Sequence, residues 1–317
     1  MIVLSIVVPI YNESVLLNEL FDRFEHVFKD IESSGIAFQS ECELIFVNDG
    51  STDDSLAQLI AYAQKQSHVR CVNLARNFGH QLAITAGLSV ATGQAIVTMD
   101  GDLQHPPECI IALYKHYASG YDVVYALPER QLGAPWFKLK TAQLFYAILN
   151  KMSPTPIAVG DFRLVSRRVL DIMNQMPEQH RLLRGMTPWI GFKQGHILYQ
   201  RDCRYAGKTK YSLLRMLMLS LDGITSFSSM PLRCVGVLGV LTSALGFIYG
   251  VYALYQHVFL SKTITGWTSL VLLVLLLGGV QLLCLGVIGE YIARIYEQSK
   301  QRPLYIIDTI YGDHASS

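Results

Sequence analysis

Two long apolar runs in the last third of the chain restrict its fold more than any other feature of the sequence. Residues 234–255 contain no charged side chain, and residues 268–289 contain none either. A helix of about 22 residues is about 33 Å long, which is enough to cross the hydrocarbon core of a bilayer. The link between the runs is short, so we expect a hairpin of two transmembrane helices over residues 233–293. The alternative is a buried pair of helices inside a soluble protein.

The distribution of basic residues predicts how this hairpin is oriented. The link between the runs holds a single lysine, Lys262. Because cytoplasmic loops carry an excess of Lys and Arg, we expect the large amino-terminal part and the tail, residues 294–317, to be cytoplasmic. The basic residues that support this orientation lie outside the runs, at Arg215, Arg233, Arg294, Lys300 and Arg302.

The first 205 residues have a different pattern, in which short apolar runs alternate with polar stretches of helical spacing. This alternation is typical of βαβ units, so the expected fold class is α/β, with a Rossmann-like, mostly parallel sheet. Residues 206–232 mix basic with apolar side chains, which favours amphipathic helices at the membrane surface over an ordinary packed helix. Strands are predicted at residues 2–9, 43–48, 69–74, 95–100 and 122–125, and helices at residues 16–31, 53–66 and 81–92.

Charge and cysteine content argue against two classes of protein. The chain has 26 Lys and Arg against 25 Asp and Glu, a net charge of +1, which does not suit a nucleic-acid partner. The 6 cysteines form no CxxC pair and have no histidine at ligand spacing, which does not suit a zinc site. Reduced thiols are expected, as in a protein that faces the cytosol.

Acidic residues follow three of the predicted strands, at the edge where an open parallel sheet binds its ligands. Asp100 and Asp102 follow the fourth strand, and Asp49 follows the second. Two such carboxylates could hold Mg²⁺ or Mn²⁺, which would stabilise the charge on the leaving diphosphate of a nucleotide-sugar. Asp49 is expected to accept a hydrogen bond from the base or ribose. Either Tyr11 or Glu13, after the first strand, is expected to reach the same part of the nucleotide.

Local pairing can also be predicted. Ser51 or Thr52 is expected to cap the helix at residues 53–66. Glu290, near the inner end of the second apolar run, is expected to pair with Arg294 one turn later. No metal-ligand set is expected among the histidines His80, His105 and His116.

Four segments at the predicted strand ends resemble the inverting glycosyltransferases of family 2, which have the GT-A fold. They are residues 8–13, 47–53, 76–79 and 99–108. Within that family the whole chain is similar to the polyprenyl-phosphate glycosyltransferases, which include dolichyl-phosphate mannose synthases and bacterial bactoprenol glucosyltransferases with two carboxyl-terminal spans. Residues 160–164, 204–211 and 289–296 carry this closer resemblance. One departure is Gly101, where the family usually has Ala, and we expect it to be harmless.

The resemblance implies a set of site residues. Arg130, past the fifth strand, lies in a loop that could close over the phosphates of the donor. Those implied to hold the nucleotide are Pro9, Tyr11, Glu13 and Asp49. Those implied to serve the metal and the diphosphate are Asp100, Asp102 and Gln104.

The resemblance also implies the reaction, which is metal-dependent, inverting transfer of a hexose to a polyprenyl phosphate at the bacterial plasma membrane. UDP-glucose and undecaprenyl phosphate are the first candidates, with formamido-aminoarabinose, mannose and N-acetylglucosamine as alternative sugars. The acceptor phosphate is already anionic, so a strong general base is less necessary than for a hydroxyl acceptor. Association of the hairpins into a homo-oligomer is left open. The basic residues expected to bring the two anions together are Arg204 and Lys208, with Lys210, Arg181 and Arg184 beside them.

Asp161 is the remaining catalytic candidate. It lies among apolar residues and is expected either to pair with Arg163 or Arg168 or to orient the acceptor or the sugar. On the second interpretation, Asp161→Ala abolishes transfer while the protein stays folded.

Two other functions compete with this one. A processive polysaccharide synthase usually carries a Gln-x-x-Arg-Trp motif and more spans, and neither Trp136 nor Trp189 has such a setting. A membrane scaffold with a degenerate nucleotide domain would not need the intact pair Asp100 and Asp102. Metal-linked nucleotide binding would distinguish the scaffold from the enzyme.

Overall fold

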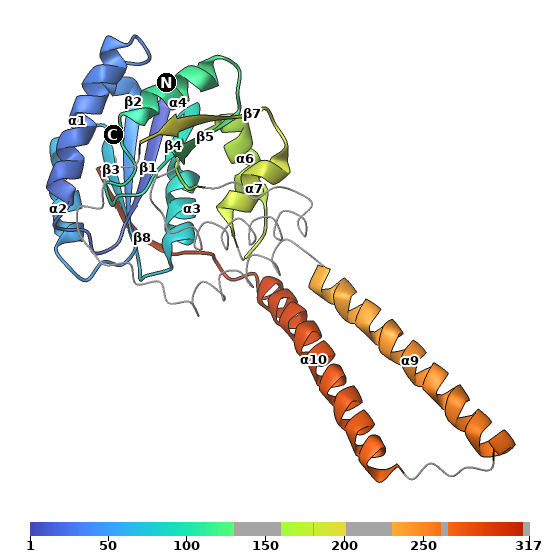
Figure 1. Cartoon of the computed structure of the whole chain (residues 1–317). Helices are drawn as coiled ribbons and strands as arrows, with labels where there is room; N and C mark the ends of the chain where they lie inside the picture. The colour runs from blue at the N-terminus through green and yellow to red at the C-terminus, as the bar shows by residue number, and fades with distance from the viewer. Residues whose placement is uncertain (130–159, 180, 201–229, 261–265, 313–317) are drawn as a thin grey trace. The chain divides into compact units, whose positions relative to one another are not determined.

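The computed structural model of the chain describes residues 1–129, 160–179, 181–200, 230–260 and 266–312 (Figure 1). These residues belong to two compact units. One contains the amino-terminal α/β part together with the residues after 301, and the other contains the two long apolar helices.

Within the described residues, one 8-stranded sheet has the order β7-β5-β6-β4-β1-β2-β3-β8. β1 pairs in parallel with β2 and β4, and β2 pairs in parallel with β3. β6 is antiparallel to β4 and β5, and β8 is antiparallel to β3. The predicted mostly parallel α/β sheet is therefore confirmed. The strands are β1 (Leu4–Ile10), β2 (Cys42–Asn48), β3 (Val69–Leu74), β4 (Ala95–Thr98), β5 (Val123–Pro128), β6 (Arg163–Ser166), β7 (Gln194–Tyr199) and β8 (Ile307–Tyr311).

Helices cover both faces of the sheet. Buried side chains of α1, α2 and α4 pack on one face, and those of α3, α6 and α7 pack on the other. Three predicted helices correspond to α1, α2 and α3. The helices of this unit are α1 (Leu17–Ser33), the short 3-10 helix η1 (Gln39–Glu41), α2 (Ser55–Lys65), α3 (His80–Val90), α4 (Cys109–Ala118), α6 (Arg167–Gln175) and α7 (Leu183–Ile190).

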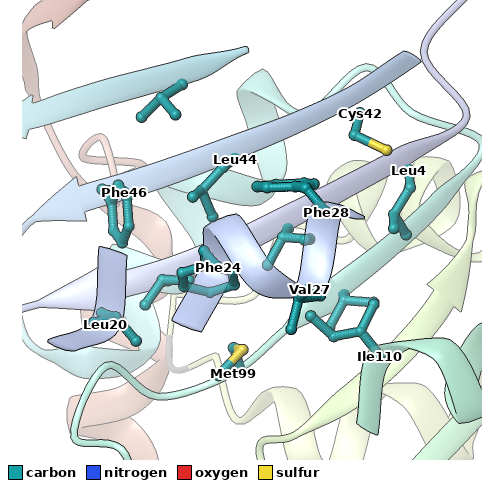
Figure 2. Packing of buried hydrophobic residues seen from close by; sticks show 14 of the residues in the cluster. Leu4, Leu20, Phe24, Val27, Phe28, Cys42, Leu44, Phe46, Met99 and Ile110 are labelled. Atoms are coloured by element: carbon teal, nitrogen blue, oxygen red, sulfur yellow. The ribbon is translucent and has the colours of Figure 1, made fainter. Parts of the chain in front are cut away.

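The packing follows directly from side-chain periodicity. On α1, apolar residues recur every three or four positions, so Leu20, Phe24 and Val27 lie on one face of the helix. Figure 2 shows these side chains against Leu44 and Phe46 of β2. In the strands, alternate residues face opposite sides of the sheet. Because β1 to β4 run parallel to one another, the loops that follow them lie at the same edge of the sheet.

The carboxyl-terminal segment returns to the sheet. Residues 294–317 were expected to form a separate tail, but α10 continues to Ser299 and Ile307–Tyr311 form β8. β8 pairs with β3, with Val72 opposite Ile310. The last described strand, β8, thus lies at the edge of the sheet that contains the amino-terminal strands.

The second unit contains α9 (Met230–Leu260) and α10 (Trp267–Ser299). Their apolar stretches, Leu232–Tyr252 and Leu276–Ser299, have mean hydropathies of 2.0 and 1.7 and are long enough to cross a membrane. Neither stretch is buried inside the structure, and Phe247 on α9 is 74% exposed. Apolar surface on this scale argues against a pair of core helices in a soluble protein. The predicted pair on α10 is confirmed, because Arg294 Nε donates to Glu290 Oε1 at 2.9 Å.

Candidate active site

Hydrogen bonds join the loops that follow β1 and β2. The Asn12 N–H donates to Ser51 Oγ at 3.1 Å, and Asn12 Oδ1 accepts from the Thr52 N–H at 2.8 Å. The Ser14 N–H donates to Asp53 Oδ2 at 3.1 Å. Asn12 has a φ of 55°, in the left-handed region that Asn adopts more readily than most residues. The two loops therefore form a single connected wall at the edge of the sheet.

Asp53 accepts a hydrogen bond at the start of α2, whose N-cap residue is Asp54. Its Oδ1 accepts from the N–H of Ser55, the first residue of the helix, at 3.0 Å. The prediction that Ser51 or Thr52 caps this helix is wrong, because both residues bond to the β1 loop instead. Burial acts to raise the pKa of Asp53, but hydrogen bonds from Ser55 and Ser14 lower it to about 2.

Asp49 connects the loop after β2 to the loop after β3. Its side chain is buried, with Oδ1 accepting from the Phe78 N–H at 2.7 Å and Oδ2 from the Gly79 N–H at 3.0 Å. Burial raises the pKa of Asp49, and the two N–H donors oppose that effect. A Cβ on Gly50 would lie 2.5 Å from the Asn77 nitrogen, so glycine permits this close approach. Both oxygens of Asp49 thus hold the loop that leads into α3, and its expected contact with the base or ribose stays a prediction.

That loop ends at His80, which lies between two aspartates. His80 Nε2 is 3.2 Å from Asp100 Oδ1 and 3.6 Å from Asp161 Oδ2. The three residues come from the start of α3, the end of β4 and the approach to β6. Burial acts to lower the pKa of His80, but its contacts with the two carboxylates raise the pKa to about 10. In the absence of a metal, His80 therefore lies between the two carboxylates and contacts both.

Two arginines also fix Asp161, which is 3% exposed. Arg184 binds both carboxylate oxygens, with Nε 2.8 Å from Oδ1 and Nη2 on Oδ2. Arg163, only 1% exposed, places Nη2 3.8 Å from Oδ1. Burial acts to raise the pKa of Asp161, but hydrogen bonds from Arg184 and His80 hold it well below its usual range. Of the two partners expected, Arg163 is near and Arg168 pairs elsewhere, while the direct partner is Arg184.

The surroundings of Asp100 fit a divalent metal. Single ligand atoms of His80, Asp100 and Asp161 lie within 4.8 Å of one another. Asp100 Oδ1 is buried, and beyond its 3.2 Å contact with His80 Nε2 it accepts no hydrogen bond from the residues that the structure describes. Carboxylate oxygens suit Mg²⁺ and Mn²⁺, and the imidazole nitrogen adds a donor typical of transition-metal sites. We call these three residues the His80 group.

Asp102 and Gln104, the other predicted metal residues, bond to each other. Asp102 Oδ1 accepts from the Gln104 N–H at 3.1 Å, and Oδ2 accepts from Gln104 Nε2 at 2.6 Å. Each carboxylate oxygen has a second lone pair. This pairing therefore fixes the direction of the Asp102 carboxylate and leaves it able to bind an ion.

The remaining predicted residues differ in their settings. Pro9 is buried within β1, Tyr11 is 48% exposed, and Glu13 is partly buried beside the start of α2. Arg181 is buried and donates to two main-chain carbonyl oxygens near the end of α6, so it serves packing of that helix. The predicted residues that lie outside the described part of the chain are Arg130, Arg204, Lys208 and Lys210.

His80 is a site residue that the sequence analysis missed. A signal was present, since His80 follows β3 and the same rule of strand ends applies to it. Its contact with Asp161 depends on a strand that was not predicted. β6 pairs antiparallel with β4, with Thr98 opposite Arg163, and this register brings Asp161 beside Asp100.

Two family models match the chain. The model of Glycosyl transferase family 2 matches residues 5–172, which is more than half of the chain. The model of the GtrB C-terminal hairpin matches residues 230–295. The first match contains the complete His80 group, and the second contains most of α9 and α10.

Curated relatives cover nearly the whole chain. The uncharacterized glycosyltransferase YkcC of Bacillus subtilis is 46% identical, over 97% of this chain and 94% of its own length. The prophage bactoprenol glucosyl transferase homolog of Escherichia coli is 38% identical, over 97% of this chain and 99% of its own. The bactoprenol glucosyl transferase of Shigella phage SfV is 37% identical, over 96% and 97%. Both the sheet and the helical pair therefore have counterparts in these proteins.

Proposed function

The chain belongs to glycosyl transferase family 2, and we propose that it transfers a hexose from a nucleotide-sugar to a polyprenyl phosphate, inverting the anomeric carbon. The observation that carries this proposal is the His80 group, at the ligand-binding edge of a sheet whose chain also holds two membrane-length helices. UDP-glucose and undecaprenyl phosphate are the proposed substrates. The Escherichia coli and phage relatives, which are named for transfer of glucose to bactoprenol, support this choice.

The metal would be held by Asp100 together with the other two members of the His80 group. Asp102 and Gln104 would lie on the diphosphate side and contact the ion directly or through water. When bound, Mg²⁺ or Mn²⁺ would stabilise the negative charge that the diphosphate gains as it leaves. Asp100 Oδ1 supports this assignment, because beyond its contact with His80 it has no hydrogen bond from the residues that the structure describes.

The donor nucleotide would occupy the wall formed by the loops after β1 and β2. Pro9, Tyr11, Glu13 and Asp49 would contact it there, and Asp49 would also hold the loop that carries His80. Arg130 would close over the phosphates.

The acceptor supplies its own nucleophile. A phosphate oxygen attacks the anomeric carbon opposite the diphosphate, whose bond to that carbon breaks, and no strong general base is needed because the attacking oxygen is anionic. Asp161 is a poor base, since its pKa is held well below the usual range. Its role would be to fix Arg184, whose positive charge offsets the repulsion between the two anionic substrates, and to position His80. Arg204 and Lys208 would bind the acceptor phosphate.

Topology is proposed as cytoplasmic for both ends of the hairpin. The pairing of β8 with β3 supports a location of both ends on the same side, because a strand that follows α10 belongs to the same sheet as the amino-terminal strands. Residues 1–205 and β8 would then form the catalytic domain, residues 206–232 an interfacial segment and residues 233–293 the transmembrane hairpin. The excess of basic residues outside the link supports the cytoplasmic side for both ends.

A lipid-transfer assay tests the function. Purified full-length protein would be incubated with undecaprenyl phosphate and radiolabelled UDP-glucose, UDP-N-acetylglucosamine or GDP-mannose, and label in the extracted lipid would be counted. We expect label from UDP-glucose with Mn²⁺ or Mg²⁺ and none after EDTA. No lipid label from any donor with metal present would favour the scaffold, and labelled polymer would favour a processive synthase.

A further inference from the structure

His105 accepts a hydrogen bond from the main chain of Asp100. The Asp100 N–H donates to His105 Nδ1 at 3.1 Å, and the same ring nitrogen is 3.6 Å from Asp100 Oδ2. His105 is 7% exposed, so solvent does not replace this contact readily. Five positions of chain separate the two residues. The bond therefore joins two parts of the loop after β4, with the main chain of Asp100 held by a side chain later in the same loop.

Aromatic side chains hold the His105 ring in place. It stacks on Phe162, with ring centroids 5.2 Å apart and planes at 25°, and meets the edge of Tyr199 at 6.1 Å. Phe162 and Tyr199 also contact each other, at 5.8 Å. Phe162 is the neighbour of Asp161 in the chain. One face of the ring thus touches the segment that carries Asp161, while its nitrogen holds Asp100.

We propose that His105 is a positioning residue that sets the spacing between the Asp100 and Asp161 carboxylates, and so tunes metal-linked binding of the donor diphosphate. The effect on donor binding rests on the proposed function, whereas the positioning of Asp100 does not. The hydrogen bond orients the main chain of Asp100, and the stack on Phe162 ties that orientation to the segment of Asp161. His105 acts through these two residues and does not itself bind the metal.

Three substitutions separate the hydrogen bond from the packing. His105→Phe keeps a ring against Phe162 but removes the acceptor. His105→Asn loses the ring but offers an oxygen near the position of Nδ1, and His105→Gln offers one near the position of Nε2. His116→Phe is a matched control, because its Nδ1 contacts the Ala112 carbonyl oxygen on α4, away from the His80 group.

The first measurement is hydrogen exchange of full-length protein without ligand. In His105→Phe and His105→Gln, peptides that contain the Asp100 amide should exchange about tenfold faster, the factor expected when one hydrogen bond of ordinary strength is lost. His105→Asn and His116→Phe should retain the parent rate. An unchanged exchange rate of the Asp100 peptides in His105→Phe overturns the inference, and this outcome does not depend on metal binding.

The second measurement is calorimetry of UDP binding to full-length protein with and without Mn²⁺. The gain in affinity that Mn²⁺ gives should fall about tenfold in His105→Phe and stay within about threefold in His105→Asn, at thermal midpoints within about 5 °C of the parent. A parent-like gain in His105→Phe, or an equal loss in both variants, overturns the positioning role. If the parent protein itself shows no gain, the proposed function fails, and the exchange result alone decides whether His105 orients Asp100.

Discussion

Asp161 shows at the scale of one residue how the site combines charge with burial. Its carboxylate is nearly inaccessible and faces Arg184, Arg163 and His80. The guanidinium of Arg163 is itself buried, and its Nη2 donates no hydrogen bond to the described residues. Arg163 therefore depends on the Asp161 charge. The sequence indicated this pairing, but it did not indicate the contacts of Asp161 with Arg184 and His80, which come from distant parts of the chain.

Asp161→Asn should reduce the rate of lipid transfer at least about 100-fold, since it removes the negative charge. The protein should remain folded, since asparagine keeps a polar group of the same shape. Asp161→Ala, which was expected to remain folded, should instead lose about 3–5 kcal/mol of stability, because it removes the hydrogen-bond acceptor of Arg184 as well as the counter-charge of the buried Arg163, whereas Asn keeps an acceptor oxygen. Transfer rates and thermal midpoints in detergent check both. Asp171→Asn, at an exposed pair with Arg167, is the control. Normal turnover by Asp161→Asn would contradict the role proposed for this carboxylate.

Gly101 tests the packing under the acidic loop. A Cβ there would lie 2.4 Å from Ile10 Cδ1, so the glycine, which was expected to be a harmless departure from alanine, avoids a close contact with this side chain. Gly101→Ala should therefore cost about 1–3 kcal/mol through overpacking, and Ile10→Val should recover much of that loss by removing the colliding methyl group. Thermal midpoints of the single and double variants measure the coupling. Strictly additive effects would show that Ile10 is not the obstacle.

At the scale of elements, the sequence predicts what depends on local pattern. β1 to β5 were found because each is a short apolar run between helical stretches. β6, β7 and β8 were missed because their pairing involves segments far apart in the chain. Ile307–Tyr311 is a short edge strand that, among the described residues, pairs with β3 alone, so the sequence around it carries little signal.

The same limit explains the candidate site. Asp49, Asp100 and Asp102 follow predicted parallel strands, so the sequence located them at one edge. The contact of His80 with Asp161 requires the antiparallel insertion of β6 beside β4. Composition and spacing say nothing of that insertion.

Removal of β8 should destabilise the sheet. A chain that ends after Gln301 leaves β3 with an unpaired edge and uncovers the core beneath Ile310, which favours aggregation. We expect the thermal midpoint in detergent to fall by more than about 5 °C, or the protein to be recovered as aggregate. A chain that ends after Gly312 keeps β8 and should match the parent. Equal stability of the two truncations would contradict a structural role for β8.

At the scale of the whole molecule, β8 and the apolar helices together predict topology. Both ends of the hairpin connect to one sheet, so both should lie on the same side of the membrane. Alkaline phosphatase is active only outside the cytoplasm, so fusion after Leu260 should give an active enzyme and fusion after Gly312 an inactive one. Activity at the second position would place the sheet outside and contradict the basic-residue rule.

Metal-linked nucleotide binding by the purified full-length protein tests the central claim most directly. Calorimetry should show that Mn²⁺ raises the affinity for UDP at least about tenfold, because Asp100 brings the ion to the diphosphate. Asp100→Asn should lose that gain, while Asp171→Asn should keep it. An affinity for UDP that is independent of Mn²⁺, or a gain that survives in Asp100→Asn, would contradict a metal site at Asp100.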